Sequence, residues 1–299
     1  MNFRRDSVPR VSIGMPVYNR PQELRRALTA IVEQTYPHLE IIVSDNASPG
    51  DDVEKVVHEF MSRDGRIQYY RQAENYGAEH NFQFVLDKAT GDYFMWASDD
   101  DWREPGFVEE LSALLTAHPE SPMAFCNFIA VLETGEPVRH YYPDFYSKMK
   151  QFTRNPALVR RLLFFLQSGR GGKANLFYGL FRRQLLDGFS FDWFIRKSGR
   201  FGMDMLFVFW ILGKGPLALS DKCLYRCTVG NKKFYQDGTG TSWNMRAVLK
   251  KSAEYSNYAF RYLLVADRGE RLFLGMLLPI KVVLLAGGMI RRRLEKRPF

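Results

Sequence analysis

The chain has 299 residues, of which 46% are hydrophobic and 25% charged, and its formal net charge is +9. This composition is typical of a globular protein with one large or two modest cores, and it excludes a disordered chain. Basic residues concentrate between Lys150 and Arg200 and again between Arg291 and Arg297, which favours phosphate-bearing partners. The amino-terminal part is not basic in this way, so we expect no nucleic-acid partner.

The cysteine content and the amino-terminal residues indicate in which cellular compartment the protein works. Three cysteines, Cys126, Cys223 and Cys227, cannot form a disulfide framework and fit a reducing environment. Cys223 and Cys227 lack further ligands at matching spacing, so a zinc site is not favoured. Residues 1–10 are polar and basic without an apolar run, which argues against a signal peptide. We therefore expect a cytoplasmic protein.

Short apolar strands alternate with amphipathic helices through the first ninety residues. We expect a strand from Val11 broken by Pro16, a helix from Pro21, a strand from Leu39, and then a helix at 51–61, a strand at 67–70 and a helix at 78–89. This alternation predicts an α/β fold with a Rossmann-like, mostly parallel sheet between flanking helices. Ligands of such sheets bind outside the carboxyl ends of the strands.

The stretch 90–105 places three adjacent carboxylates directly after a buried aromatic strand. Asp99, Asp100 and Asp101 would repel one another, and a cation would offset this repulsion. Mg²⁺ or Mn²⁺ fits such oxygen ligands, with substrate phosphates completing the coordination shell. An alternative is that the acids cap the helix that begins near Pro105. Since a cap needs only one Asp, we favour a metal that carries a phosphate.

Polar residues also follow the earlier strands. Tyr18-Asn19 and Asp45-Asn46 should lie with the acidic cluster on one edge of the sheet, because each follows a strand's carboxyl end. The chain contains neither a G-x-G-x-x-G after its first strand nor a P-loop motif, which argues against dinucleotide-binding and P-loop folds.

Five motifs occur in a fixed order in this part of the chain. They are Pro16-x-Tyr18-Asn19-Arg20, Ser44-Asp45-Asn46-Ala47-Ser48, Glu74-Asn75-Tyr76-Gly77, Ala89-x-Gly91-Asp92-Tyr93 and the acidic cluster. In this order they resemble the nucleotide-binding half of a family 2 glycosyltransferase with the GT-A fold. The resemblance implies nucleotide-binding roles for Pro16, Tyr18, Asn19, Asp45, Asn75 and Asp99, with Asp45 accepting a hydrogen bond from the base.

The acidic cluster departs from the pattern of that family. The family's Asp-x-Asp cluster usually has a proline four residues after its last Asp. Counting back from Pro105 places Ser98 where the first Asp would stand. Asp100 is therefore our first choice as metal ligand and Asp99 the second, with Asp101 as a further candidate.

The resemblance extends to the acceptor side. Residues 175–183 resemble a strand that runs into Arg-Arg, and Asp204 precedes an apolar helix where the family carries an acidic pair. Met203 occupies the first place of that pair, so the role of general base falls to Asp204 alone. The alternative is that Asp204 is the N-cap of a helix at 205–212. In the segment 229–243, candidates for a lid over the diphosphate are Lys232, Lys233 and Trp243.

The carboxyl-terminal part is predicted to be helical from about Trp243. As a helix, the almost continuously apolar stretch 272–290 would be about 28 Å long, enough to cross a bilayer core. Pro279 and Lys281 count against a simple span. We favour a helix that lies on the cytoplasmic leaflet, held by Arg291–Arg293. The alternative is a core helix of the domain.

These observations predict three regions and a reaction. Residues 8–130 would bind the nucleotide sugar, 131–242 the acceptor, and 243–299 would form a membrane-associated extension. The expected reaction moves a sugar from a nucleoside-diphosphate sugar to the hydroxyl group of a glycan, a lipid-linked molecule or another acceptor, with inversion. We expect it on the inner face of the cell membrane, at an anionic surface, in polysaccharide or lipid-linked glycan synthesis.

Two alternatives from other classes remain open. One is a non-catalytic module of the same fold that binds sugars or membranes, because the first Asp and the acidic partner of Asp204 are missing. The other is a metal-dependent nucleotidyltransferase, which would leave Asp204 without a role.

Overall fold

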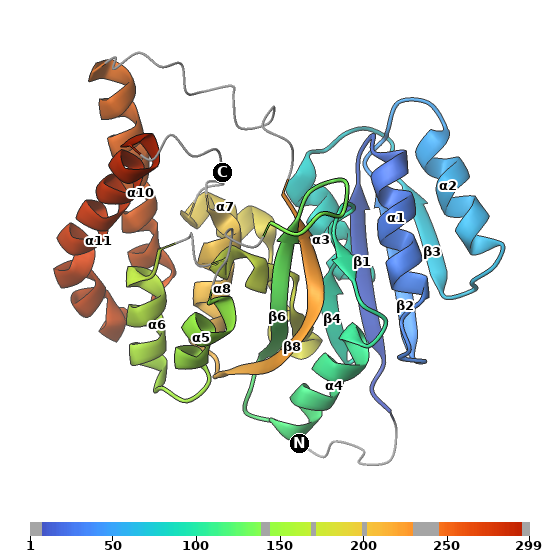
Figure 1. Cartoon of the computed structure of the whole chain (residues 1–299), viewed down its shortest axis with the longest axis horizontal. Helices are drawn as coiled ribbons and strands as arrows, with labels where there is room; N and C mark the ends of the chain where they lie inside the picture. Colours follow the sequence, from blue (N-terminus) through green and yellow to red (C-terminus); the bar gives the residue numbers. More distant parts are fainter. Residues whose placement is uncertain (1–7, 139–143, 169–171, 199–201, 230–244, 295–299) are drawn as a thin grey trace. The chain divides into compact units, whose positions relative to one another are not determined.

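The computed structural model describes residues 8–138, 144–168, 172–198, 202–229 and 245–294 (Figure 1). Its contacts define two compact units. The first unit comprises Met1–Phe128, Tyr178–Trp193 and Ala218–Arg226, and the second comprises Ile129–Phe177, Phe194–Leu217 and Cys227–Phe299. The predicted division of function along the chain stays a prediction.

The first unit opens with the alternation that the sequence predicts. Its elements are β1 (Val11–Val17), α1 (Pro21–Val32), β2 (Leu39–Asp45), α2 (Asp52–Met61), β3 (Ile67–Arg71), α3 (Ala78–Lys88) and β4 (Tyr93–Trp96). Strands β3, β2, β1 and β4 are neighbours in that order and run parallel. They bury apolar side chains on both faces, since every residue of β1, β2 and β4 is buried.

Antiparallel pairs extend this sheet. The further elements are β5 (Trp102–Arg103), α4 (Phe107–Ala117), β6 (Met123–Val131), β7 (Leu180–Arg182), α7 (Phe191–Ser198) and β8 (Leu217–Thr228). The eight strands lie in the order β3-β2-β1-β4-β7-β6-β8-β5, and β7 pairs antiparallel with both β4 and β6. The sheet is therefore mixed, with a parallel first half.

Two local expectations need correction. Strand β1 continues through Pro16, because its ladder with β4 ends at the pair Gly14 and Trp96, so the missing N–H of Pro16 interrupts no bond on that side. The expected strand at 175–183 is mostly a 3₁₀ helix, η3 (Lys173–Tyr178), before the short β7.

The second unit is mainly helical. It contains α5 (Phe145–Met149), α6 (Ala157–Leu166), α8 (Met203–Leu212), α10 (Met245–Val265) and α11 (Arg268–Leu294). Helix α11 packs on α10 and α6, and α8 packs on α6 and α10. Among the described residues, no helix combines the length and the apolarity that crossing a bilayer requires.

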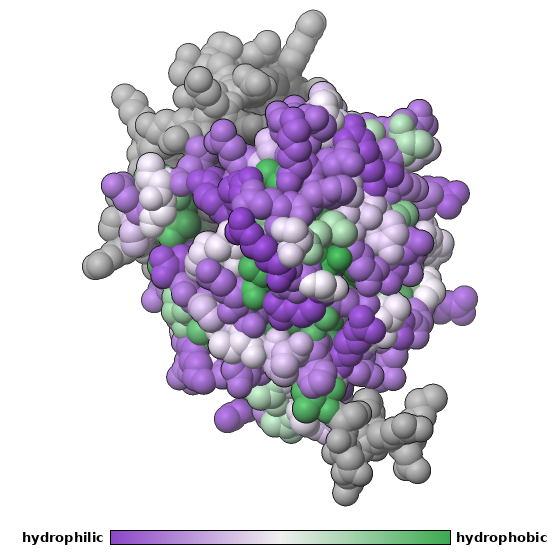
Figure 2. Space-filling view, turned by 90° about the vertical axis from the view of Figure 1, so that its right-hand side faces the viewer, coloured by the Kyte–Doolittle hydropathy of each residue, from purple (hydrophilic) through white to green (hydrophobic). Residues whose placement is uncertain are grey.

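The outer face of the first unit around α2 and β3 is mostly hydrophilic (Figure 2). Apolar side chains appear there only in small, scattered groups, as on an ordinary protein surface.

Candidate active site

The register of the parallel strands brings four loops to one edge of the sheet. Val17 pairs with Asp45, and Asp45 pairs with Arg71, so β1, β2 and β3 end side by side. On the other side of β1, Gly14 pairs with Trp96, the last residue of β4. The loops that follow these strands carry the residues predicted from the sequence.

Hydrogen bonds tie three of these loops together. The Asn19 backbone N–H donates to the Ser48 hydroxyl oxygen over 2.7 Å. The Asn46 side chain donates to the Asn75 amide oxygen over 2.8 Å. Tyr18 is 43% exposed beside this junction, whereas Pro16 is buried in β1. The structure therefore brings Tyr18, Asn19 and Asn75 to the predicted edge.

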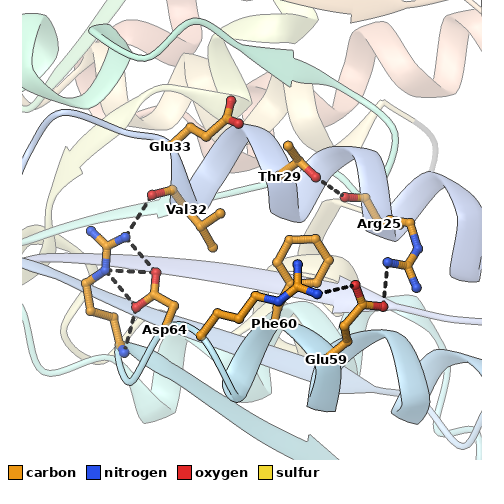
Figure 3. A pocket seen from close by; sticks show the side chains of 9 residues that line it. Arg25, Thr29, Val32, Glu33, Glu59, Phe60 and Asp64 are labelled. Atoms are coloured by element: carbon orange, nitrogen blue, oxygen red, sulfur yellow. Dashed lines mark hydrogen bonds and ion pairs between the residues drawn. The ribbon is translucent and has the colours of Figure 1, made fainter.

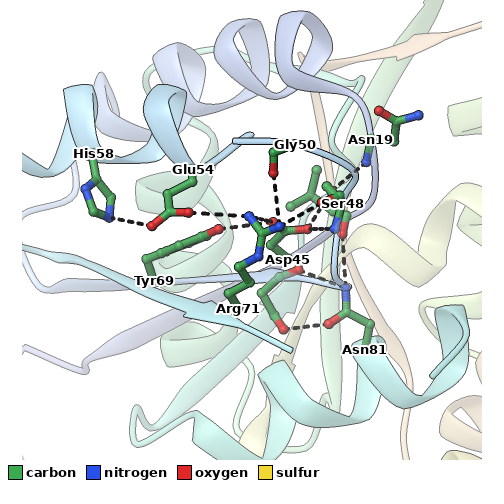
Figure 4. A network of polar contacts seen from close by, with 11 residues as sticks. Asn19, Asp45, Ser48, Gly50, Glu54, His58, Tyr69, Arg71 and Asn81 are labelled. Atoms are coloured by element: carbon green, nitrogen blue, oxygen red, sulfur yellow. Dashed lines mark hydrogen bonds and ion pairs between the residues drawn. The ribbon is translucent and has the colours of Figure 1, made fainter. Parts of the chain in front are cut away.

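Asp45 forms the centre of a buried polar network (Figure 4). Its side chain is fully buried. One carboxylate oxygen accepts bonds from the backbone N–H and hydroxyl of Ser48. The other accepts the Tyr69 hydroxyl over 3.0 Å and lies 3.6 Å from Arg71. Arg71 also donates to the carbonyl of Gly50. A contact between Asp45 and a nucleotide base stays a prediction.

The acidic cluster divides into two parts. Asp99 Oδ1 and Asp100 Oδ2 lie 2.9 and 3.0 Å from the same nitrogen, Nη1 of Arg20. Asp101 is buried separately and accepts a hydrogen bond from the Tyr225 hydroxyl. Tyr225 lies on β8, which pairs with β5 directly after the cluster. Two of the three carboxylates thus face one cation, while the third is held by the sheet.

Burial and a neighbouring negative charge disfavour the ionised form of Asp99. The pKa of Asp99 is raised to about 7, because burial and the charge of Asp100 raise it more than the charge of Arg20 lowers it. Helix α4 has Gly106 at its N-cap and no side-chain cap, so the alternative that the cluster caps this helix is wrong. The cluster is therefore a place where a cation is needed.

The donor set of Asp99 and Asp100 fits a divalent metal ion. Among the residues that the structure describes, no three His, Cys, Asp or Glu side chains are grouped closely enough to hold a metal by themselves. Mg²⁺ commonly takes only one or two protein carboxylates and completes its shell with water and phosphate oxygens. An oxygen of Asp99 and an oxygen of Asp100 both lie within 3.0 Å of one Arg20 nitrogen, so this pair has the number and kind of ligands that Mg²⁺ takes from a protein.

Asp204 lies in the second unit, in the first turn of α8. The N-cap of this helix is Gly202, so the alternative that Asp204 is the N-cap is wrong. Burial raises the pKa of Asp204, while the backbone N–H groups of Met205 and Asp204 and the charge of Lys173 lower it. A raised pKa suits a carboxylate that accepts a proton.

The start of α8 is fixed by its packing on α10. Gly202 has a φ of 69°, and a Cβ atom there would lie 2.3 Å from the ring of Tyr258. The Tyr258 hydroxyl lies 3.5 Å from the sulfur of Met205. This packing sets the position of Asp204 within the second unit.

The predicted lid residues Lys232, Lys233 and Trp243 lie outside the described residues. Their role over a diphosphate stays a prediction.

A groove between α1 and α2 is a different kind of feature (Figure 3). Each of its arginines lies beside a carboxylate: Glu59 lies 2.6 Å from Arg25 and 3.3 Å from Arg63, and Asp64 lies 2.6 Å from Arg66. Asp64 and Arg66 precede β3, so the groove lies at the amino edge of the sheet, opposite the site. Its arginines are neutralised by carboxylates and do not form an anion site.

Two residues of the site were not assigned roles from the sequence. Arg20 was noted only as the end of a motif, yet its charge between a Pro-x-Tyr-Asn segment and a helix was a usable signal. Tyr225 lies 124 positions from Asp101, and no local pattern connects them.

A parallel half-sheet with acidic residues and amide side chains at its carboxyl edge defines an α/β protein of the class whose ligands bind at that edge. The sequence model described as "Glycosyl transferase family 2" matches residues 12–181. The chain belongs to this family.

Curated relatives are similar over part of their length. The chain is 28% identical to "Glycosyltransferase GlyA" of Streptococcus pneumoniae over 232 residues, which cover 76% of this chain and 30% of that protein. It is 28% identical to "Putative glycosyltransferase EpsH" of Bacillus subtilis, covering 52% of this chain and 48% of that protein. A 38% identical segment of 96 residues matches a Campylobacter jejuni "GalNAc(5)-diNAcBac-PP-undecaprenol beta-1,3-glucosyltransferase", covering 31% of this chain and 30% of that protein. The chain thus spans less than half of the length of these relatives.

Solved structures share the fold. TarS of S. aureus superposes with a TM-score of 0.60 at 15% identity, covering 95% of this chain and 54% of that chain. A shorter form of TarS was solved with UDP-GlcNAc; it has a TM-score of 0.56 at 18% identity and covers 88% and 71% of the two chains. The mannosyltransferase PcManGT of Pyrobaculum calidifontis, solved with GDP-Man and Mn²⁺, has a TM-score of 0.54 at 16% identity and covers 96% and 76%. These similarities show the GT-A fold predicted from the sequence.

Proposed function

We propose that this protein transfers a sugar from a nucleoside-diphosphate sugar to a hydroxyl acceptor with inversion at the anomeric carbon. The observation that carries the proposal is the convergence of Asp99 and Asp100 on one cation position, at the loop edge of a family 2 fold. TarS structures with UDP and UDP-GlcNAc and the PcManGT structure with GDP-Man support a nucleotide-sugar donor.

The donor half of the reaction is assigned to the first unit. Asp100, with Asp99, would hold Mg²⁺ or Mn²⁺, and Tyr18, Asn19 and Asn75 would contact the nucleotide sugar. The metal would supply positive charge to the departing diphosphate. Arg20 would leave the two carboxylates when the ion binds, and its guanidinium would then be available to the diphosphate oxygens.

The acceptor half is assigned to Asp204. Its carboxylate would take the proton of the acceptor hydroxyl as that oxygen attacks the anomeric carbon on the face opposite the leaving group, which inverts the configuration. The raised pKa of Asp204 makes it a stronger base than an ordinary carboxylate. Support for this role comes from its place in the family motif and from its half-buried position in the first turn of α8.

We further propose that the acceptor is a lipid-linked glycan or a growing surface polysaccharide, and that the protein works on the inner face of the cell membrane. The similarity to an enzyme named for an undecaprenol-linked substrate supports this acceptor class. The basic residues that end α11 and follow it support an anionic membrane surface as a partner.

Product analysis tests the reaction class. The full chain is incubated with UDP-sugars and GDP-sugars, and in parallel with nucleoside triphosphates and sugar phosphates, each with Mn²⁺ or with chelator. The released product is identified. The proposal predicts metal-dependent release of nucleoside diphosphate. Release of pyrophosphate from nucleoside triphosphate and sugar phosphate would instead identify a nucleotidyltransferase. Absence of turnover with every donor, despite donor binding, would identify a non-catalytic module.

A further inference from the structure

Helix α11 exposes its apolar side chains and buries its one central charge. Between 272 and 287, every described position that is exposed carries an apolar residue or glycine. This apolar stripe consists of Leu272, Phe273, Met276, Pro279, Ile280, Val283, Leu284 and Gly287. Leu272 and Val283 are each 69% exposed. Amphipathic helices of water-soluble domains normally show the reverse arrangement.

The stripe is one continuous face of the helix. At 100° per residue its positions fall within an arc of roughly 140°, and Lys281 falls outside this arc. Lys281 is 2% exposed, and its ammonium donates to the Gln167 carbonyl over 3.3 Å. The same ammonium lies 5.5 Å from the ring centroid of Phe165, and Leu274 is fully buried. Lys281 and Leu274 therefore fix which face points inward, and α11 cannot bury the stripe by rolling.

Positively charged residues at the two ends of the apolar stripe indicate the kind of surface that covers it. Arg268 and Arg271 are exposed at the start of α11. Arg291–Arg293 follow the stripe in the sequence, and Lys296 and Arg297 come after them. An apolar face bracketed by cations matches the interface of an anionic bilayer, where acyl chains take the apolar side chains and headgroups take the arginines.

We propose that the apolar stripe docks on an anionic lipid bilayer, with the axis of α11 parallel to the membrane plane. The stripe is sixteen residues long, or about 24 Å, which is less than the hydrocarbon thickness of about 30 Å. Its side chains enter the headgroup and upper acyl region without spanning it. This proposal deepens the membrane association proposed above by naming its surface and orientation. The docking itself does not depend on glycosyl transfer.

Vesicle sedimentation of the full chain tests the docking. Vesicles of phosphatidylcholine alone are compared with vesicles that also contain phosphatidylglycerol. We expect the protein to sediment with the anionic vesicles and to be released as salt is raised. The triple variant Met276→Gln, Ile280→Gln, Val283→Gln should lower the vesicle affinity by at least about tenfold.

Matched changes on other helices serve as the control. Met61 of α2 and Val159 of α6 are exposed apolar residues outside the stripe, 38% and 39% exposed. Met61→Gln with Val159→Gln should leave vesicle binding unchanged. The unfolding midpoint of each variant establishes that it folds.

Three results would overturn the proposal. The wild type could remain in solution with both kinds of vesicle, or the folded triple variant could bind as well as the wild type. The wild type could also be a dimer that the triple variant converts to a monomer, which would assign the stripe to a second copy. Loss of nucleoside diphosphate release in assays without vesicles would refute the proposed reaction and leave the docking standing.

Discussion

Charges are buried in both compact units, but the sign of the charge and its partners differ. The first unit buries the carboxylates of Glu40, Asp45 and Asp101, together with Arg103 and Arg182. The four charged residues of the second unit that are buried in the described structure are all cations: Arg160, Arg161, Lys173 and Lys281. Arg182 of the first unit donates to the carbonyls of Leu115 and His118 at the end of α4, so a buried cation completes a helix end in this unit as well.

The buried cations of the second unit bind helix carboxyl ends. Arg160 donates to the carbonyl of Leu212, the last residue of α8, and Arg161 donates to that of Phe209. Lys173 and Lys281 both donate to the carbonyl of Gln167, directly after α6. These carbonyls have no partner within their helices and carry the negative end of the helix dipole. All four buried cations of the second unit thus bind helix carboxyl ends, and Arg161 in addition pairs with Asp267 and Glu270.

Among the buried acids of the first unit, Asp45 and Asp101 lie at or follow the carboxyl ends of strands at the site, whereas Glu40 lies at the opposite, amino edge of the sheet. Glu40 and Asp45 accept hydroxyl and backbone donors that fix the loops around them. At the loop edge, Asp99 and Asp100 share a single arginine, and burial raises the pKa of Asp99. The two units thus differ in the sign of the charge that they bury: in the described structure, acids are buried only in the first unit, and the second unit buries cations alone.

Asp204 is a partly buried acid in the second unit, whose buried charged residues in the described structure are cations. Removing its carboxylate should have the largest effect on the rate of sugar transfer. Asp204→Asn should lower the rate of sugar transfer by about 10² to 10⁴-fold, because the general base is lost. Donor binding should remain, since the donor is assigned to the first unit. Initial rates and donor titrations measure the two effects separately.

The pH dependence and a matched variant sharpen that test. Because burial raises the pKa of Asp204, the wild-type rate should rise with pH through a value above the ordinary Asp value of 3.8. Asp192 is an exposed acid in the first turn of α7, and Asp192→Asn should leave the rate unchanged. If Asp204→Asn transfers sugar at the wild-type rate, Asp204 is not the general base.

A pair of glycine substitutions compares the backbones of the two units. Gly202 and Gly188 have φ angles of 69° and 75°. Gly188→Ala should cost about 1–2 kcal/mol of unfolding free energy, from the left-handed backbone alone. Gly202→Ala should cost more, about 2–4 kcal/mol, because its Cβ would overlap the buried ring of Tyr258. Denaturant unfolding measures both; equal losses would show that the Tyr258 contact is not restrictive.

Replacing a buried cation of the second unit should raise stability. Burial lowers the pKa of Lys281 to about 8 from its ordinary value of 10.5. Lys281→Met should therefore stabilise the protein at pH 7 by up to about 3 kcal/mol. The Gln167 carbonyl keeps its bond from Lys173.

The lowered pKa of Lys281 determines how the stability difference between the wild type and Lys281→Met depends on pH. Between pH 8 and 10.5 the unfolded chain holds a proton on Lys281 that the folded protein does not. Wild-type stability from this group should thus rise with pH, and the gap to Lys281→Met should close over that window. A gap that stays constant with pH would show that Lys281 is not charged and buried at neutral pH.

Local patterns were sufficient to predict the parallel half of the sheet. The apolar strands, the proline at the start of α1 and the polar residues after each strand all act within a few positions. Strand register then brings Asn19 to Ser48 and Asn46 to Asn75 without further information, because parallel strands end at a common edge.

Local sequence patterns could not predict the pairing of distant segments or the orientation of helices. The bond from Tyr225 to Asp101 and the antiparallel strands depend on segments far apart in the chain. The sequence indicated that α11 is apolar, but the direction of Lys281 depends on packing against α6 and α10. The N-cap alternative for Asp204 failed because Gly202, with its positive φ, begins the helix earlier.

The central claim is that Asp99 and Asp100 bind a donor nucleotide through a divalent cation. Its most direct test is the unfolding midpoint of the full chain with uridine, guanosine or thymidine diphosphate, each with Mn²⁺, Mg²⁺ or chelator. We predict that one nucleotide raises the midpoint only when metal is present, and that Asp100→Asn abolishes the rise. A nucleotide shift that persists in chelator or in Asp100→Asn, or no shift with any nucleotide and metal, would contradict the claim.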